Sequence, residues 1–160
     1  MKRTLLIFGC AAMLFTMGGC ISDNGTYPTP SANFTPKQTY AIPHDKLWQT
    51  ILDTLDKNRI TTVNIDKSSD IIQTDYIAAP GTLIALGFGG AQNIRYKYNI
   101  SLRSEADGSE KMNIICKIES SMYNGQGSSQ WRDVTPSDTA LATKLETWLY
   151  EQIEDGLKTP

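Results

Sequence analysis

The sequence predicts an α+β fold, a two-layer arrangement in which an antiparallel sheet packs against two helices in the order β-α-β-β-β-β-α. Apolar residues recur at helical spacing over 43–57 and again over 135–156. Between these segments, 94–103 and 111–119 alternate apolar and polar residues, as strands with one buried face do. An antiparallel hairpin with one apolar face needs a cover of helices, so the two patterns together predict the two layers.

The folded part is predicted to begin at Thr39, with a short strand over 40–42. Pro43 suits the first turn of the helix that follows, because that position needs no backbone N–H. The helix should end near Asn58, a residue that can adopt the left-handed backbone conformation. Its apolar stripe consists of Leu47, Trp48, Ile51, Leu52 and Leu55.

Four strands are predicted to follow this helix. The first pair, 60–66 and 71–78, is joined by a turn at 67–69. The second pair is the long hairpin, which turns at Asp107-Gly108. In the simplest register, two pairs of residues face each other in the core: Tyr98 with Cys116, and Ile100 with Ile114.

The last helix is predicted from a start signal and an apolar stripe. Thr135, Pro136 and Asp138 resemble a capping box with a proline in the first turn, and Gly156 is a suitable stop. The segment 130–134 could add one further strand before this helix. The stripe consists of Leu141, Leu145, Trp148, Leu149 and Ile153.

The first 19 residues have the pattern of an export signal. Lys2 and Arg3 precede a mostly apolar run over 5–17, which is long enough for a signal peptide and shorter than the about 20 residues that span a bilayer. Gly18, Gly19 and Cys20 then resemble the lipobox of bacterial lipoproteins, although an ordinary secretory signal with a chance cysteine is the alternative.

The lipobox resemblance implies that the signal is removed and that Cys20 becomes the first residue of the mature chain. It also implies that Cys20 carries a diacylglycerol and an N-acyl lipid as a membrane anchor. In that family an aspartate after the cysteine marks retention in the inner membrane. The residue here is Ile21, which implies the outer membrane, facing the periplasm.

Residues 20–38 are predicted to be a flexible tether between the lipid and a single domain at 39–158. This stretch is rich in Pro, Ser, Thr, Asn and Gly, and it holds little apolar surface. The tether would keep the domain close to its membrane.

Composition limits the classes of function. The formal charge of −2 becomes −4 once Lys2 and Arg3 leave with the signal, which argues against a nucleic-acid binder. With Cys10 removed and Cys20 lipidated, Cys116 is the one remaining thiol, so no intramolecular disulfide is expected. Cys116 alternates in phase with apolar neighbours and is predicted to be buried and unreactive.

No catalytic or metal-binding pattern is found, and the chain is predicted not to be an enzyme. His44 is the single histidine, is expected on an exposed helix turn, and has no ligand cluster beside it in the sequence. Asp66, Asp70 and Asp75 lack the spacing of a calcium loop and are interpreted as turn carboxylates. The glycines at 87–90 are not followed by a P-loop lysine, so no nucleotide site or other cofactor is expected.

Two surfaces are candidates for binding a partner. Basic side chains share the outer face of the hairpin, which is either a solvated sheet face or a contact for an anionic partner: Arg95, Lys97, Arg103, Lys111 and Lys117. The connection 79–91 carries Leu83, Leu86 and Phe88, and it either closes one end of the core or meets a partner or the bilayer. Trp131 is expected to pack under the final helix, with partner contact as the alternative.

Several of these features together resemble a domain of BamC (NlpB), a lipoprotein family of the outer-membrane β-barrel assembly machinery. The matching residues are Ile42-Pro43, Leu47-Trp48, Ile71-Ile72-Gln73-Thr74-Asp75 and Trp148-Leu149, over about 39–157. The resemblance implies a helix-grip α+β fold, in which a sheet grips a long C-terminal helix. This chain has one such domain where that family has two, and its tether is shorter.

The sequence therefore favours an outer-membrane lipoprotein that binds or scaffolds another envelope protein during envelope assembly or maintenance. A second hypothesis is a helix-grip carrier of a small apolar or lipid ligand. Such a carrier would enclose a cavity lined by Tyr96, Tyr98, Trp148 and Phe88. Neither hypothesis involves nucleic acid, and the sequence leaves the oligomeric state open.

Overall fold

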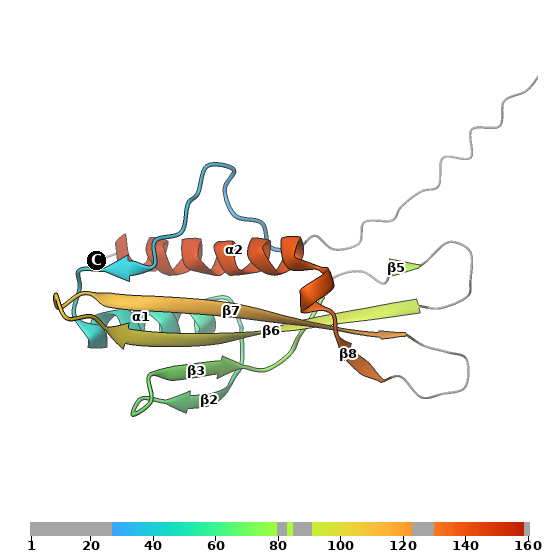
Figure 1. Cartoon of the computed structure of the whole chain (residues 1–160), viewed down its shortest axis with the longest axis horizontal. Helices are drawn as coiled ribbons and strands as arrows, with labels where there is room; N and C mark the ends of the chain where they lie inside the picture. The colour runs from blue at the N-terminus through green and yellow to red at the C-terminus, as the bar shows by residue number, and fades with distance from the viewer. Residues whose placement is uncertain (1–26, 80–82, 85–90, 123–129, 159–160) are drawn as a thin grey trace, which may run out of the picture.

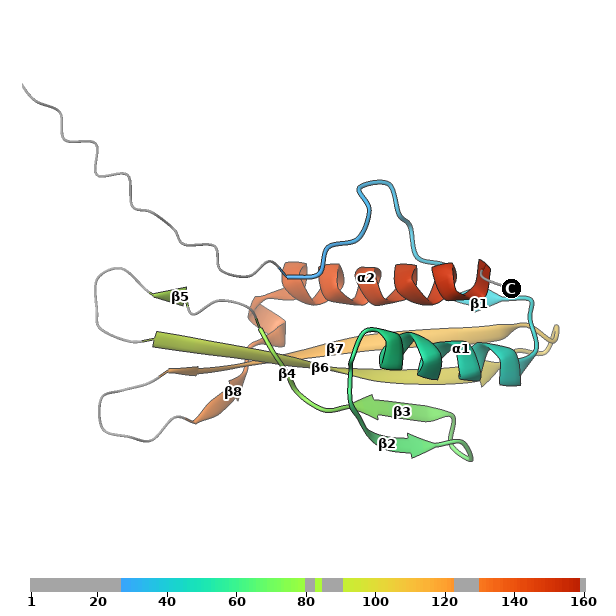
Figure 2. The same cartoon turned by 180° about the vertical axis from the view of Figure 1, so that it is seen from behind.

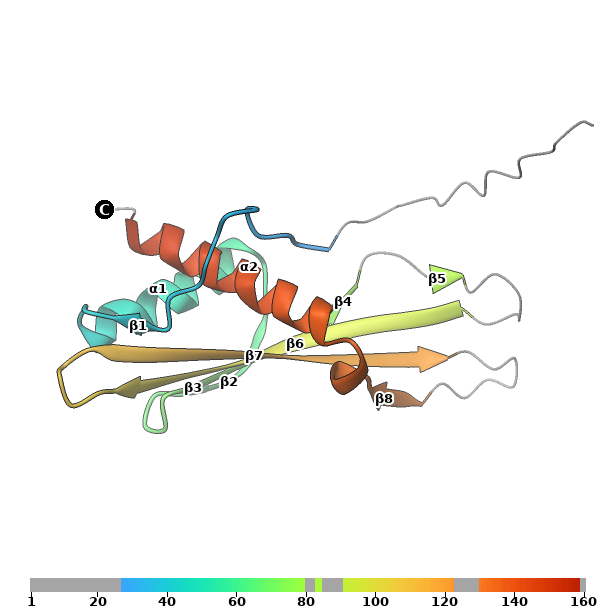
Figure 3. The same ribbon diagram turned by 45° about the horizontal axis from the view of Figure 1, so that its top comes forward.

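The computed structural model describes residues 27–79, 83–84, 91–122 and 130–158. These residues form an antiparallel sheet of eight strands in the order β1-β7-β6-β3-β2, with β4 and β5 also paired to β6 and β8 paired to β7. Two helices lie on the same side of the sheet (Figure 1; Figure 3). The predicted two-layer α+β fold is confirmed.

The helices are α1 (His44–Lys57) and α2 (Thr139–Lys158), and a 3-10 turn, η1 (Thr135–Ser137), precedes α2. The strands are β1 (Thr39–Tyr40), β2 (Thr62–Asp66), β3 (Ile71–Thr74), β4 (Ile77–Ala78), β5 (Leu83–Ile84), β6 (Ala91–Ser104), β7 (Glu110–Met122) and β8 (Trp131–Asp133). The predicted strand 71–78 is thus divided into β3 and β4. β5 lies within a connection that was not predicted to contain a strand.

The hairpin of β6 and β7 is the frame of the sheet. Its register places Tyr98 opposite Cys116 and Ile100 opposite Ile114, as the alternating pattern predicts. All four side chains are buried beneath the helices, together with apolar side chains from α1 and α2. The predicted burial of Cys116 is confirmed, and burial raises the pKa of its thiol to about 12.

Along the middle part of β7, the outer edge of the strand is covered by side chains and not by another strand. β1 pairs with the start of β7 and β8 with its end. Between them, the Tyr150 hydroxyl accepts a hydrogen bond from the Ile114 N–H at 3.1 Å and donates one to the Met112 carbonyl at 3.0 Å. Two further side chains accept bonds from this edge: Glu146 from the Cys116 N–H at 2.8 Å, and the Thr135 hydroxyl from the Ile118 N–H at 2.9 Å. Helix α2 is therefore held to the sheet by hydrogen bonds as well as by packing.

Gly156 brings the two helices close together. The sequence suggests this glycine as a helix stop, but α2 continues to Lys158, so that prediction is wrong. A Cβ atom at Gly156 would lie 3.0 Å from Thr50 Cγ2 and 3.2 Å from Thr54 Oγ1 on α1. The glycine thus serves the helix contact.

Two predicted helix caps are placed differently in the structure. Arg59, rather than Asn58, adopts the left-handed conformation after α1, with φ 58°, and the Ile60 N–H bonds to the Leu55 carbonyl as in a Schellman motif. Asp138, rather than Thr135, caps α2, because its carboxylate accepts the Leu141 N–H at 3.3 Å.

The segment 27–38 lies across α2 (Figure 3). Tyr27 and Phe34 pack against the core, and the Lys37 N–H bonds to the Glu154 carboxylate at 3.0 Å. A flexible tether therefore does not describe 27–38, because two aromatic rings and helix carboxylates hold this stretch in place. Residues 20–26 of the predicted tether and the predicted signal at 1–19 lie outside the described residues.

We expect Tyr150→Phe to lower the free energy of unfolding by about 1–3 kcal/mol, because it leaves a buried N–H and a carbonyl of β7 without their partner. Urea unfolding followed by circular dichroism measures this loss. The control is Thr147→Ala on the same helix, where the hydroxyl bonds within the helix to the Thr143 carbonyl. We expect a change of at most about 0.5 kcal/mol there, and equal losses in the two variants would contradict the edge role of Tyr150.

Candidate functional site

The basic residues predicted for partner binding all face the helix-free side of the sheet. Arg95, Lys97 and Arg103 lie on β6 and alternate with buried core residues, and Lys117 lies directly opposite Lys97 on β7. Arg103 lies at the other end of the hairpin, opposite Lys111. Of the predicted apolar contact residues, Leu83 lies on β5, while Leu86 and Phe88, like Cys20, lie outside the described residues.

The cations of this face are partly neutralised by Glu119. This glutamate is opposite Arg95 in the register and is only 8% exposed. Its carboxylate accepts hydrogen bonds from Arg95 Nη2 at 2.7 Å, Lys117 Nζ at 2.9 Å and the Tyr76 hydroxyl at 2.7 Å. Two of the four predicted contact cations, Arg95 and Lys117, are therefore paired within the protein.

These contacts determine the protonation of Glu119. Burial alone would raise the pKa of its carboxyl group, but the hydrogen bonds from Tyr76, Lys117 and Arg95 outweigh burial and lower the pKa to about 2. The bond to Glu119 also raises the pKa of Lys117. The group is therefore ionised and paired at neutral pH.

The Arg95 guanidinium contacts two aromatic rings. Its central carbon lies over the ring of Tyr76, 3.8 Å from the centroid, and over the ring of Trp131, 3.9 Å from the centroid. Trp131 is on β8 and is 38% exposed, so the expectation that it packs under the final helix is wrong. We call Tyr76, Arg95, Lys117, Glu119 and Trp131 the Arg95 cluster.

A groove of about 410 Å³ adjoins the Arg95 cluster. Tyr76, Arg95 and Trp131 form part of its wall, and the rest is lined by Ala78 and Ala79 at the end of β4 and by Asn93 and Ile94 of β6. Ser121 lies between Asn93 and Trp131 in the register. Its hydroxyl is buried and has no hydrogen-bond partner among the described residues.

Sequence reasoning missed two members of this cluster for different reasons. Glu119 is the register partner of Arg95, so the predicted hairpin already contained the signal that the charge of Arg95 is offset. Tyr76 comes from the break between β3 and β4, where Asp75 leaves the β3 ladder and its N–H bonds to the Thr61 carbonyl. A single alternating strand over 71–78 does not reveal that break.

His44 is not the isolated surface histidine that was expected. Its Nε2 lies 3.2 Å from Asp70 Oδ1, its Nδ1 lies 3.1 Å from Glu110 Oε2, and its ring stacks on Trp48. The histidine thus links the start of α1 to β7 and to the turn before β3. Asp66 accepts bonds from the Ser68 and Ser69 N–H groups, as expected of a turn carboxylate. Within the described part of the chain, no group of three or more His, Cys, Asp or Glu residues is placed to hold a metal ion.

The place where a carrier would need its cavity is closely packed. Tyr96 and Tyr98 are buried, and the Tyr98 hydroxyl donates to the Leu145 carbonyl of α2 at 3.3 Å. Trp148 packs partly buried against the same core, and Phe88 lies outside the described residues. Sheet and helix are in direct contact here, which gives the carrier hypothesis no support.

No family model matches the chain, and no curated protein matches it either.

We expect acid to weaken the folded state partly through Glu119. The pKa of this group is about 2 when folded, below its ordinary value of 4.5, so its stabilising effect is complete above pH 4.5 and is lost as the pH falls toward 2. In Glu119→Gln, the free energy of unfolding should fall less steeply across this window than in the wild type. The two slopes should differ by up to about 1.4 kcal/mol per pH unit. Urea titrations from pH 5 to pH 2.5 measure the slope.

The matched control is Asp56→Asn, which neutralises an exposed carboxylate on α1. This variant should keep the wild-type slope. A wild-type slope in Glu119→Gln as well would show that the contacts of Glu119 do not stabilise the fold.

Proposed function

We propose that this protein is a non-enzymatic lipoprotein, anchored through lipid on Cys20 to the periplasmic face of the outer membrane, that binds another envelope protein through the Arg95 cluster. The anchor rests on the charged start, apolar run and Gly-Gly-Cys pattern of residues 1–20. No described helix is long and apolar enough to cross a membrane. The likeness to a BamC helix-grip domain supports the envelope setting.

The observation that carries the binding role is the contact of the Arg95 guanidinium with the rings of both Tyr76 and Trp131. Tryptophan, tyrosine and arginine are the residue types most enriched at the energetic centres of protein interfaces. Here Arg95 is held by two bonds to Glu119, from Nε and Nη2, and its guanidinium contacts two aromatic rings. A cluster that is ordered before binding loses less side-chain entropy when a partner docks.

The pairing of charges indicates the chemistry of the partner. Arg95 and Lys117 are offset by Glu119, and Lys117 also lies 3.8 Å from Asp133. A strongly acidic partner would therefore gain little from these two cations. A partner that places an apolar or planar side chain in the groove beside Trp131, with hydrogen bonds at its rim, fits this surface better.

Catalysis is not part of the proposal because the reactive residue types are otherwise engaged. Both ring nitrogens of His44 contact carboxylates, and Cys116 is buried with a raised thiol pKa. The apolar connection 79–91 is retained as a second part of the docking surface. Within it, Leu83 and Ile84 of β5 pair with Gln92 and Ala91 at the cluster end of β6.

We expect Cys20→Ala to release the protein from the membrane, because the variant lacks the residue that would carry the lipid anchor. Fractionation of cells with a high-salt wash measures this, with the wild-type chain as the reference. Retention of the variant in the membrane fraction would refute the anchor.

We expect Trp131→Ala to reduce partner capture about ten-fold or more, which corresponds to at least about 1.4 kcal/mol of binding free energy. A photoreactive amino acid at Lys97 would be crosslinked in cells, and the adduct quantified by mass spectrometry. Trp131→Phe, which keeps an aromatic face on Arg95, should recover part of the yield.

The control for this experiment is Ile115→Ala, which truncates an exposed residue on the same helix-free face, two residues before Lys117 on β7, that is not a member of the cluster. Its adduct yield should equal that of the wild type. If Trp131→Ala and Ile115→Ala give the same yield, the cluster is not the docking site.

A further inference from the structure

A second surface lies at the opposite edge of the sheet from β8. Strand β2 ends the strand order, and Figures 1 and 2 show it outside β3. Among the described residues no strand pairs with the outer side of β2, so its outward N–H and C=O groups form an open row. Proteins usually cover, charge or shorten such an edge because it can pair with another chain.

The edge is also unusually apolar. Four large apolar residues are exposed in the described part of the chain, and two of them, Val63 at 61% and Ile65 at 50%, belong to this five-residue strand. Ile65 lies opposite the buried Ile72, so it points to the helix side of the sheet. The exposed side chain of Ile65 therefore continues the apolar surface of the core out to the edge of the sheet.

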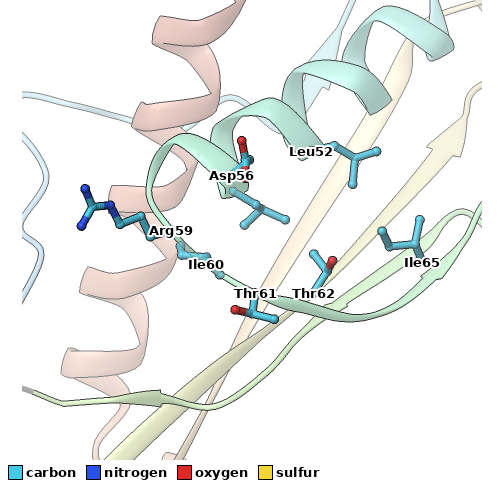
Figure 4. A pocket seen from close by; sticks show the side chains of 8 residues that line it. Leu52, Asp56, Arg59, Ile60, Thr61, Thr62 and Ile65 are labelled. Atoms are coloured by element: carbon cyan, nitrogen blue, oxygen red, sulfur yellow. The ribbon is translucent and has the colours of Figure 1, made fainter.

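A groove of about 570 Å³ runs between β2 and the end of α1. Figure 4 shows Leu52 and Asp56 on the helix, with Thr62 and Ile65 across from them on the strand. Leu55 and Ile60 are apolar parts of the lining, while Asp56 and Arg59 contribute one charge of each sign. The groove thus offers an apolar floor without a net charge.

We propose that the β2 edge and this groove bind an extended segment of an envelope protein, which adds as a strand beside β2 and places an apolar side chain against Leu52 and Ile65. An extended chain is the backbone form that can satisfy an open row of strand donors and acceptors. Because its side chains alternate between faces, every second one points to the helix side, where the groove lies. A docked helix satisfies its own backbone and would leave the row unpaired.

The local backbone limits how much strand can be added. The β2–β3 register shifts between Thr62 and Asn64, which places a bulge at Val63, and bulges interrupt regular pairing. The regular part of the edge is therefore Asn64 to Asp66. A short edge with an aspartate at its end favours a brief, selective contact and disfavours open-ended pairing between copies of the chain.

This surface is distinct from the Arg95 cluster, so the two proposals can fail separately. A photoreactive amino acid would be placed in turn at Asn64, Ile65 and Asp66 of the full-length protein in living cells, and the adducts mapped by mass spectrometry. The expected result is one partner segment whose crosslinked position moves stepwise along its sequence as the probe moves along β2. Such stepwise movement is the signature of a paired strand.

Ile65→Lys should reduce the adduct from position 64 about ten-fold or more, because it places a charge beside the apolar floor. Ile115→Lys is the matched control: the same substitution at a residue of similar exposure, 52%, but on the helix-free face. Thermal unfolding of both variants checks that they fold equally well. Ile65→Lys should leave the adduct from a probe at Lys97 unchanged.

Several outcomes would overturn the proposal. These are the absence of adducts from β2, adducts spread over unrelated segments without a register, adducts to a second copy of this chain, or equal loss in Ile65→Lys and Ile115→Lys. If a probe at Lys97 of the full-length protein gives no adduct while the β2 probes still give theirs, the Arg95 docking site is refuted and the β2 proposal stands.

Discussion

The pairing of β6 with β7 is the constraint on which both faces of the molecule depend. With Tyr98 opposite Cys116, every second residue from Tyr96 to Leu102 and from Met112 to Ile118 enters the core beneath α1 and α2. The same register places Glu119 opposite Arg95 on the other face. A slip of one residue would turn the core side chains to solvent and separate this pair, so core packing and the Arg95 cluster are selected together.

The two long edges of the sheet are treated differently. Along β7, Tyr150, Glu146 and Thr135 bond to backbone groups that have no strand partner, which joins α2 to the sheet. Along β2, the outer backbone row has no strand partner in the described part of the chain, and Val63 and Ile65 are exposed. Because its backbone groups are hydrogen-bonded, the β7 edge is closed. The β2 edge, with an unpaired backbone row, is suited to pairing with another strand.

On the helix-free face, interactions within the protein convert separate charges into an ordered surface. Glu119 binds Arg95, Lys117 and Tyr76 together, and the ring of Trp131 also contacts the Arg95 guanidinium. The resulting cluster offers shape and aromatic contact more than net charge. This favours selection of a partner by fit, with the proposed lipid on Cys20 setting the place where the partner is met.

The sequence alone determined the two layers, the hairpin register and the burial of Cys116, because these follow from alternation and helical spacing within short stretches of chain. It placed Arg95, Lys97, Arg103 and Lys117 on one face for the same reason. Only the tertiary structure decided which aromatic rings Arg95 contacts, since Tyr76 comes from the break between β3 and β4 and Trp131 from β8, both outside the hairpin. It also decided the contacts of His44 with Asp70 and Glu110, the close approach at Gly156, and the packing of 27–38 on α2. Each of these joins segments far apart in the chain, and local patterns carry no information about such distances.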